Sequence, residues 1–135
     1  MITFDVIGLP APQGSKRHVG NGVMIESSKA LKPWRDSVAA AAREVADDVG
    51  MLDGPLHLAV DFRFPMPKSR PKAAHQAGVA AKTTAPDIDK LLRGVADALK
   101  VGGLIKDDAL IYSVRCRKWE VTGWTGAIVS LEQVL

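Results

Sequence analysis

The chain has 135 residues, of which 47% are hydrophobic and 24% charged, and its formal net charge is +3. This length suits one domain over residues 1–135, and the composition excludes a disordered chain. No apolar run is long enough to cross a bilayer, and no signal peptide is expected, so we predict no membrane partner. Cys116 is the single cysteine, which favours the reducing cytoplasm, and the scattered histidines fit no common zinc spacing.

The first predicted element is a strand over residues 2–9, where apolar and polar residues alternate loosely. Residues 10–22 follow as a loop that carries basic side chains and no acid. Because glycine allows a close approach to a ligand, we predict that Lys16 and Arg17 contact the phosphate backbone of DNA. A solvated loop remains the alternative. Residues 23–25 suit one arm of a short hairpin.

A long helix is predicted over residues 31–49, where apolar side chains such as Trp34 and Val38 recur at helical spacing. A proline near its start and Gly50 after its end agree with these limits. Trp34 lies on the apolar stripe of the helix. We therefore expect it in the core, rather than stacked on a DNA base.

Residues 56–64 are predicted to form a strand with one buried face, because Leu58, Val60 and Phe62 alternate with polar positions. Asp61 belongs to the opposite face, where we expect it to be solvated.

The least structured part of the chain is predicted over residues 65–85, named here the basic segment. It contains four cationic side chains and no acid: Lys68, Arg70, Lys72 and Lys82. A loop of this length in a compact domain is usually functional or disordered. Because the segment leads directly into the acidic stretch described next, we predict that its cations bind DNA phosphates, and that it becomes ordered only on DNA. A solvated connector is the alternative.

Residues 86–111 are the most informative stretch. Its apolar positions at i, i+3, i+4, i+7 and i+11 predict one face of a helix: Ile88, Leu91, Leu92, Val95 and Leu99. Gly102 is expected to end the helix as a left-handed cap. At its start, Asp87 is expected in extended conformation and Asp89 at or near the cap, so both carboxylates can face one point.

Asp107 and Asp108 form a second acidic pair. A helix of about 12 residues runs about 18 Å away from the first pair, and seven or eight extended residues cover about 25 Å on the return. One of these two carboxylates can therefore reach the first pair if the connection doubles back. If it does not, a second protomer would have to supply the third carboxylate.

Converging carboxylates repel one another unless a cation lies among them. Ligation by oxygen alone suits Mg²⁺ or Mn²⁺, and these metals serve phosphodiester cleavage. The alternative is that the acids cap a helix or a turn, with Asp89 and Asp97 in ordinary surface pairs with Arg93.

The next strand is predicted over residues 109–121, with an apolar face formed by Leu110, Tyr112, Val114 and Cys116. The other face carries Arg115 and Arg117, which we predict to extend a DNA-binding surface. Residues 122–124 are interpreted as a hairpin turn into a last strand over residues 125–135. The whole pattern predicts an α+β fold, with two helices packed on a small mixed, mostly antiparallel sheet.

The acidic stretch resembles the RusA family of Holliday-junction resolvases, whose members show D-x-D-N-L-x-K, then D-A-L and D-D at similar spacing. Here the chain reads P-D-I-D-K-L-L-R, then D-A-L, then D-D-A. The resemblance implies a RusA-like fold, and it places the metal-binding carboxylates on Asp87, Asp89 and Asp108. The catalytic lysine of the family falls on Arg93, and Lys90 stands where asparagine is usual. Arginine holds a phosphate well but donates a proton less readily than lysine, so Lys90 is a second candidate for that role.

The implied function is a Mg²⁺-dependent endonuclease that resolves four-way junctions or other branched DNA in recombination and repair, with Mn²⁺ as the other metal. A junction of near two-fold symmetry needs two matched cuts, so we expect a homodimer. An apolar surplus in the helix end near Leu99, in residues 101–105 and in the last strand would supply the dimer interface. The alternative function is a DNA-binding module without catalysis. Neither the preferred branched substrate nor the cut sequence follows from these residues.

Overall fold

The computed structural model describes residues 1–14, 16–18, 24–26 and 29–134, with residues 16–18 and 24–26 described by their backbone alone. In this part of the chain, no helix is long and apolar enough to cross a membrane. The elements in chain order are β1 (Ile2–Ile7), β2 (Lys16–His18), β3 (Met24–Glu26), α1 (Leu31–Val49), β4 (Leu56–Pro65), α2 (Lys72–Ala77), β5 (Val79–Ala81), α3 (Ile88–Val101), the 3₁₀ turn η1 (Asp108–Leu110), β6 (Ile111–Val121) and β7 (Gly126–Gln133).

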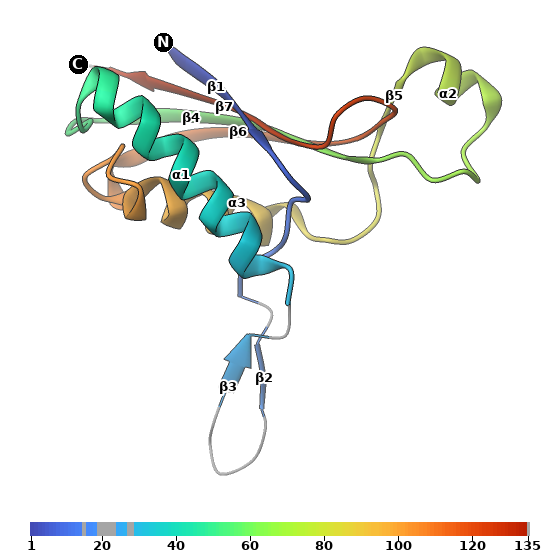
Figure 1. Ribbon diagram of the computed structural model, residues 1–135, viewed down its shortest axis with the longest axis horizontal. Coiled ribbons are helices and arrows are strands. Elements are labelled where there is room, and N and C mark those ends of the chain that lie inside the picture. Colours follow the sequence, from blue (N-terminus) through green and yellow to red (C-terminus); the bar gives the residue numbers. More distant parts are fainter. Residues whose placement is uncertain (15, 19–23, 27–28, 135) are drawn as a thin grey trace.

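The main sheet has five strands in the order β1-β7-β4-β6-β5. Strands β4 and β6 are parallel, and every other neighbouring pair is antiparallel. A parallel pair needs a crossover connection, which α3 provides between β4 and β6. The sheet is therefore mixed and mostly antiparallel, and the predicted α+β fold is confirmed. Strands β2 and β3 form a separate two-stranded sheet, which extends away from the domain as a hairpin (Figure 1).

Helices α1 and α3 pack on one face of the sheet (Figure 1). Both helices bury most of the stripe that their periodicity predicts, with Trp34 and Val38 from α1 and Leu91 and Leu99 from α3 at most 2% exposed. The exception on α3 is its first residue, Ile88, which is 38% exposed. They meet alternate residues of β4, including Leu58, Val60 and Phe62. The expectation that Trp34 belongs to the core is confirmed.

The end of α3 differs from its prediction. Gly102 has a right-handed conformation with φ of −73°, so it is not a left-handed cap; Gly103 has φ of +80° instead. A Cβ on Gly102 would stand 2.5 Å from the carbonyl oxygen of Ala39 on α1. Glycine is therefore required at this point by the close approach of the two helices.

The connection from β6 to β7 is not a hairpin, because the two strands are not neighbours. Strand β4 lies between them and pairs with both. The turn after β6 passes over the end of β4, where the Nε of Arg63 donates a hydrogen bond to the carbonyl oxygen of Trp124 at 2.9 Å. Spacing between two strand patterns cannot distinguish a hairpin from this arrangement.

The basic segment is more structured than predicted, since it contains α2 and β5. The acid that it lacks comes from β6: Glu120 is 5% exposed and accepts a hydrogen bond from the Nε of Arg70 at 2.6 Å. Lys82 lies 3.7 Å from the same carboxylate. These contacts fold the segment onto the sheet and explain why it does not need DNA for this order.

Strand β6 begins at Ile111, after the short turn η1. Its predicted apolar face is only partly buried, because Tyr112 is 64% exposed and Val114 48% exposed. Strand β5 pairs only with residues 119–121 of β6. The first half of β6 therefore lies at the edge of the described sheet, next to α3.

Candidate active site

The first pair of acids stands where α3 begins. Asp87 is the residue before the helix and has an extended conformation, with φ of −69° and ψ of 140°, and its side chain makes no capping hydrogen bond. Asp89 lies in the first turn. Both are exposed, and the predicted local geometry of Asp87 is confirmed. Neither carboxylate is used to hold the helix end, so both remain available for a ligand.

The second pair divides into two roles. Asp107 caps η1, because its carboxylate accepts a hydrogen bond from the backbone N–H of Ala109 at 3.1 Å, and the Nζ of Lys100 lies 3.8 Å away. The hydrogen bond from Ala109, together with Asp108 and the charge of Lys100, lowers the pKa of Asp107 below its ordinary value. Asp108, the next residue, is exposed on the pocket side.

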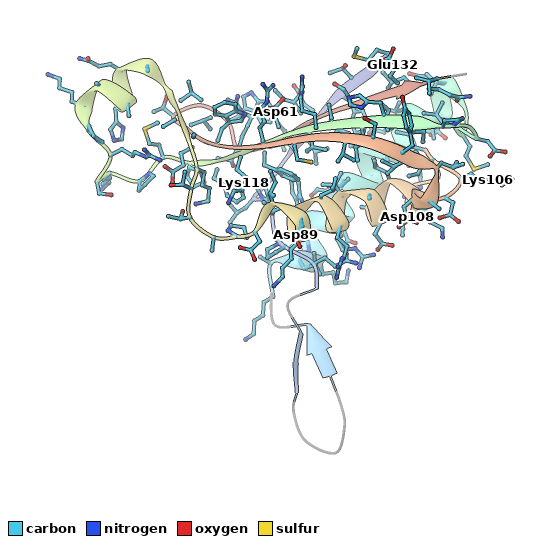
Figure 2. The ribbon with its side chains drawn as sticks, turned by 180° about the vertical axis from the view of Figure 1, so that it is seen from behind. Asp61, Asp89, Lys106, Asp108, Lys118 and Glu132 are labelled. Carbon is cyan, nitrogen blue, oxygen red and sulfur yellow. The ribbon has the colours of Figure 1, made fainter. Side chains whose placement is uncertain are left out.

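A pocket of about 390 Å³ brings three of the predicted residues together. Asp89 and Arg93 come from α3, and Asp108 comes from η1. Figure 2 labels the two acids. Apolar residues form the rest of the lining: Leu92, Ala96, Ala109, Ile111 and Val114. Two exposed carboxylates and an exposed guanidinium thus lie around a group of apolar side chains. The connection after α3 turns back far enough for Asp108 to share this pocket with Asp89.

A second pocket of about 530 Å³ adjoins the first through Asp89. It also contains Asp87, with Lys82, Arg117 and Lys118 among its lining residues. Asp87 and Asp108 therefore flank Asp89 from two sides, one in each pocket. Sequence patterns do not identify Lys118, because the pairing of its strand with the basic segment has no local signal.

The described residues contain no group of three or more His, Cys, Asp or Glu side chains placed to hold one metal ion. The donor set along these two pockets is nevertheless made of carboxylate oxygens alone, which suits Mg²⁺ or Mn²⁺ and not zinc. Asp87, Asp89 and Asp108 thus fit such an ion by chemistry.

Arg93 lies against the loop that precedes β2. Gly14 has φ of +101°, and a Cβ at this position would stand 2.6 Å from the Nη1 of Arg93. The N–H of Gln13 donates to the carbonyl oxygen of Lys90 at 3.0 Å, which fixes the loop along α3. Arg93 lines the first pocket, whereas Lys90 lines neither of the two. Asp97 pairs with Arg35 of α1 rather than with Arg93, so that predicted surface pair is wrong.

The predicted DNA-binding residues fall into several places. The side chains of Lys16 and Arg17 lie outside the described residues; their strand, β2, belongs to the hairpin whose base adjoins α3 (Figure 2). Lys68 and Lys72 are exposed, whereas Arg70 and Lys82 contact Glu120. This separates the four cations of the basic segment into two free of Glu120 and two engaged by it.

The guanidinium groups of Arg115 and Arg117 lie around Asp61, and Arg117 is also among the residues that line the second pocket. The Nε of Arg117 donates to Asp61 at 2.7 Å, Arg115 lies 3.7 Å from it, and the indole N–H of Trp119 donates to it at 2.9 Å. Burial acts to raise the pKa of Asp61, but the hydrogen bonds and charges of these partners outweigh it and lower the pKa. Asp61 is 17% exposed as a side chain, so its expected solvated role is wrong; it organises these side chains.

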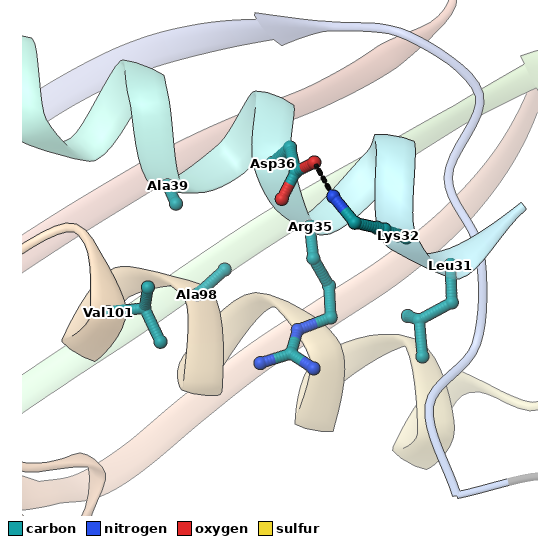
Figure 3. A pocket seen from close by; sticks show the side chains of 7 residues that line it. All are labelled: Leu31, Lys32, Arg35, Asp36, Ala39, Ala98 and Val101. Carbon is teal, nitrogen blue, oxygen red and sulfur yellow. Dashed lines mark hydrogen bonds and ion pairs between the residues drawn. The ribbon is translucent and has the colours of Figure 1, made fainter. Parts of the chain in front are cut away.

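Two remaining features lie apart from the acids. Burial raises the pKa of the Cys116 thiol to about 11, which agrees with a packing role. A pocket of about 420 Å³ between α1 and α3 is lined by Leu31, Lys32, Arg35, Asp36, Ala39, Ala98 and Val101 (Figure 3). The ion pair of Lys32 and Asp36 stands at its rim (Figure 3), and none of the predicted catalytic residues lines it.

Comparison with known proteins was consistent with this arrangement. Residues 8–132 match the family model described as "Endodeoxyribonuclease RusA". The chain is also 31% identical over 125 residues to "Uncharacterized protein YqaN" of Bacillus subtilis (strain 168), and this match covers 87% of each chain. The match to the family spans both pockets and every strand of the main sheet except β1.

Proposed function

Because the chain belongs to the RusA endodeoxyribonuclease family, which implies endodeoxyribonuclease activity, we propose that it resolves four-way junctions or related branched DNA with Mg²⁺, as a single domain, in recombination and repair. The observation that carries this proposal is the first pocket, where Asp89 and Arg93 of α3 share a lining with Asp108 of the next element, η1. A surface used only for binding DNA would not need two carboxylates facing the phosphate, because they repel it.

Asp87, Asp89 and Asp108 would hold the metal ion. When bound, Mg²⁺ supplies a charge that activates water and stabilises the leaving oxygen of a phosphodiester. Arg93 binds the scissile phosphate through its planar fork of donors, and Gly14, which has no side chain, leaves room for that fork. Since arginine does not give up its proton, we assign Arg93 to binding and leave the proton to water, or to Lys90 when DNA is present.

A homodimer would supply the two matched cuts that a junction requires. The predicted source of the interface needs correction: Leu99, Leu104 and Ile105 are at most 1% exposed within one protomer, so they belong to its own core. The exposed apolar side chains of β6 are Tyr112 and Val114, at 64% and 48%, and Val114 lines the first pocket. A second protomer in this region could also complete the ligand set of the metal, the other alternative that the sequence leaves open.

The test compares cleavage of end-labelled four-way junction, flap, fork and linear duplex in Mg²⁺ and in EDTA. We expect paired cuts in the junction with Mg²⁺ and none with EDTA. Asp89→Asn should abolish cutting while junction binding in EDTA persists. The matched control is Asp47→Asn, an exposed acid on α1, which should cut like the wild type. Binding to every branched DNA without cutting in either condition would favour the alternative, a DNA-binding module.

A further inference from the structure

Strand β6 holds Lys118 in a rigid setting beside the acids. On one side Lys118 pairs with Phe62 of β4. On the other side the carbonyl oxygen of Lys118 accepts a hydrogen bond from the N–H of Lys82 at 3.0 Å. Its side chain therefore starts from backbone that is hydrogen-bonded towards both neighbours. Such a side chain can act as a fixed support for a less regular segment nearby.

The ammonium group of Lys118 contacts the backbone immediately before Asp87. Its Nζ donates to the carbonyl oxygens of Thr84 and Pro86, each at 2.8 Å. Hydrogen bonds from a charged donor are roughly twice as strong as neutral ones. The two bonds bracket the peptide that leads into Asp87, so they determine where this residue enters α3.

Glu120 supports the same segment from a second point on β6. It lies two residues beyond Lys118 and thus on the same face of the strand. Its buried carboxylate contacts Arg70 and Lys82, which stand before the stretch that Lys118 binds. The end of the basic segment is thereby held at two points, and Lys118 is the point nearest to the acids.

Lys118 also faces the acids across one pocket. Its residue lines the second pocket together with Asp87 and Asp89, and Figure 2 shows it on the sheet above the start of α3, where Asp89 is labelled. A positive charge here reduces the repulsion between two neighbouring carboxylates.

We propose that Lys118 is a positioning residue of the metal site: its ammonium group fixes the Thr84–Pro86 backbone and thereby places Asp87 beside Asp89 to receive a divalent cation. The proposal rests on the proposed function in that the cation is the one used for cleavage. It assigns Lys118 no contact with the reacting phosphate.

The first measurement is hydrogen exchange of the full chain without metal or DNA, followed by mass spectrometry. In Lys118→Met, peptides over residues 84–91 should exchange about 10-fold faster than in the wild type, because the backbone before α3 loses its support. Peptides from α1 should not change. Lys118→Arg, which can still donate to two carbonyls, should recover much of the protection. Lys32→Met, which breaks the exposed ion pair with Asp36 on α1, is the matched control and should behave like the wild type.

The second measurement is binding of Mn²⁺ alone by calorimetry, with the thermal midpoint of unfolding recorded for each variant. Loss of a group that orients a metal ligand typically weakens metal affinity 10- to 100-fold, and we expect a loss of about this size in Lys118→Met. Junction binding in EDTA should stay within about two-fold of the wild type. If Lys118→Met does not fold, Lys118→Gln, which keeps one donor group, takes its place.

Three outcomes would overturn the proposal. Unchanged exchange over residues 84–91 would show that Lys118 does not hold this segment. Faster exchange with unchanged Mn²⁺ affinity would make Lys118 a support of the loop alone. Weaker junction binding with unchanged Mn²⁺ affinity would make it a phosphate contact. A wild-type chain that binds Mn²⁺ but cuts no branched DNA would refute the nuclease function alone, because the exchange and Mn²⁺ measurements would still decide the role of Lys118.

Discussion

Asp107 and Asp108 show how two adjacent and chemically identical side chains receive different surroundings. The carboxylate of Asp107 accepts the N–H of Ala109 and lies near Lys100, whereas Asp108 lines the pocket with Asp89. A group already engaged by the backbone is a poor ligand for a mobile ion, since binding would require those contacts to break. At this scale the structure supports the choice of Asp108 that the family resemblance implies.

Asparagine variants of Asp107 and Asp108 can therefore be compared directly in a cleavage assay. Asp108→Asn should lower junction cleavage in Mg²⁺ by about 100-fold or more, because it removes a ligand charge. Asp107→Asn should lower it by less than about 10-fold, through a weaker cap of η1. Single-turnover cleavage rates measure both. Equal losses in the two variants would mean that Asp107 also binds the ion, and a wild-type rate in Asp108→Asn would remove this residue from the site.

Asp61 carries a prediction about stability and pH. Its pKa is lowered from 3.8 in the folded protein, so its ionised form stabilises the fold above about pH 3.8 and this contribution is lost as the pH falls through the lower, folded value. Asp61→Asn should reduce the free energy of unfolding by about 1–2 kcal/mol at pH 7, and the difference from the wild type should narrow below pH 3.8. Urea unfolding at pH 7 and pH 3 measures this difference. Asp5→Asn, an exposed acid on the same face of the sheet, should have little effect; a gap for Asp61→Asn that does not narrow at any pH below 3.8 would contradict the assignment.

At the scale of elements, local periodicity was enough to predict α1, α3, β1, β4, β6 and β7, because each has a repeating apolar face. The predictions were wrong where a residue far away in the sequence determines the local structure. The acid that engages Arg70 is Glu120, fifty residues later in the chain, and the strand between β6 and β7 is β4. Gly102 makes its close contact with Ala39 of another helix. None of these contacts can be recognised from the pattern of a few neighbouring residues in the sequence.

The basic segment now separates into two kinds of cation. Lys68→Ala with Lys72→Ala should reduce the slope of log K against log salt for DNA binding by about 0.9 for each phosphate that is no longer neutralised, with no effect on stability. Arg70→Ala should instead reduce the free energy of unfolding by about 1–3 kcal/mol, because it leaves the buried Glu120 carboxylate short of a donor. Filter binding over a salt series and thermal unfolding distinguish the two. An unchanged slope in the double variant would make the segment a connector only.

At the scale of the whole molecule, the predicted assembly follows from the substrate rather than from the fold. One protomer presents one pair of acidic pockets, while a junction needs two cuts. The exposed apolar side chains of β6, Tyr112 and Val114, stand beside the first pocket, where contact with a second copy would bring two sites near each other.

We therefore expect a dimer of about twice 14.4 kDa by light scattering at micromolar concentration. Val114→Glu should shift the distribution towards monomer, because it would bury a charge in such a contact. Val49→Glu, at an exposed apolar position near the end of α1, is the control. A clean monomer, both free and with junction DNA, would refute the dimer and favour an enzyme that nicks one strand of a simpler branched substrate.

The order of the sheet has a consequence for synthesis of the chain on the ribosome. All four pairings in the main sheet involve β6 or β7, so none of them can form before Ile111 has been made. Strand β1 is made first but can pair only after β7, the last strand, has been made, because β7 is its partner. Until then the apolar residues of β4 have no strand to pair with, and a nascent chain in this state is open to aggregation. Assembly of the sheet is thus a late event, and β4 stays without a partner strand for as long as it takes to make the 45 residues between Pro65 and Ile111.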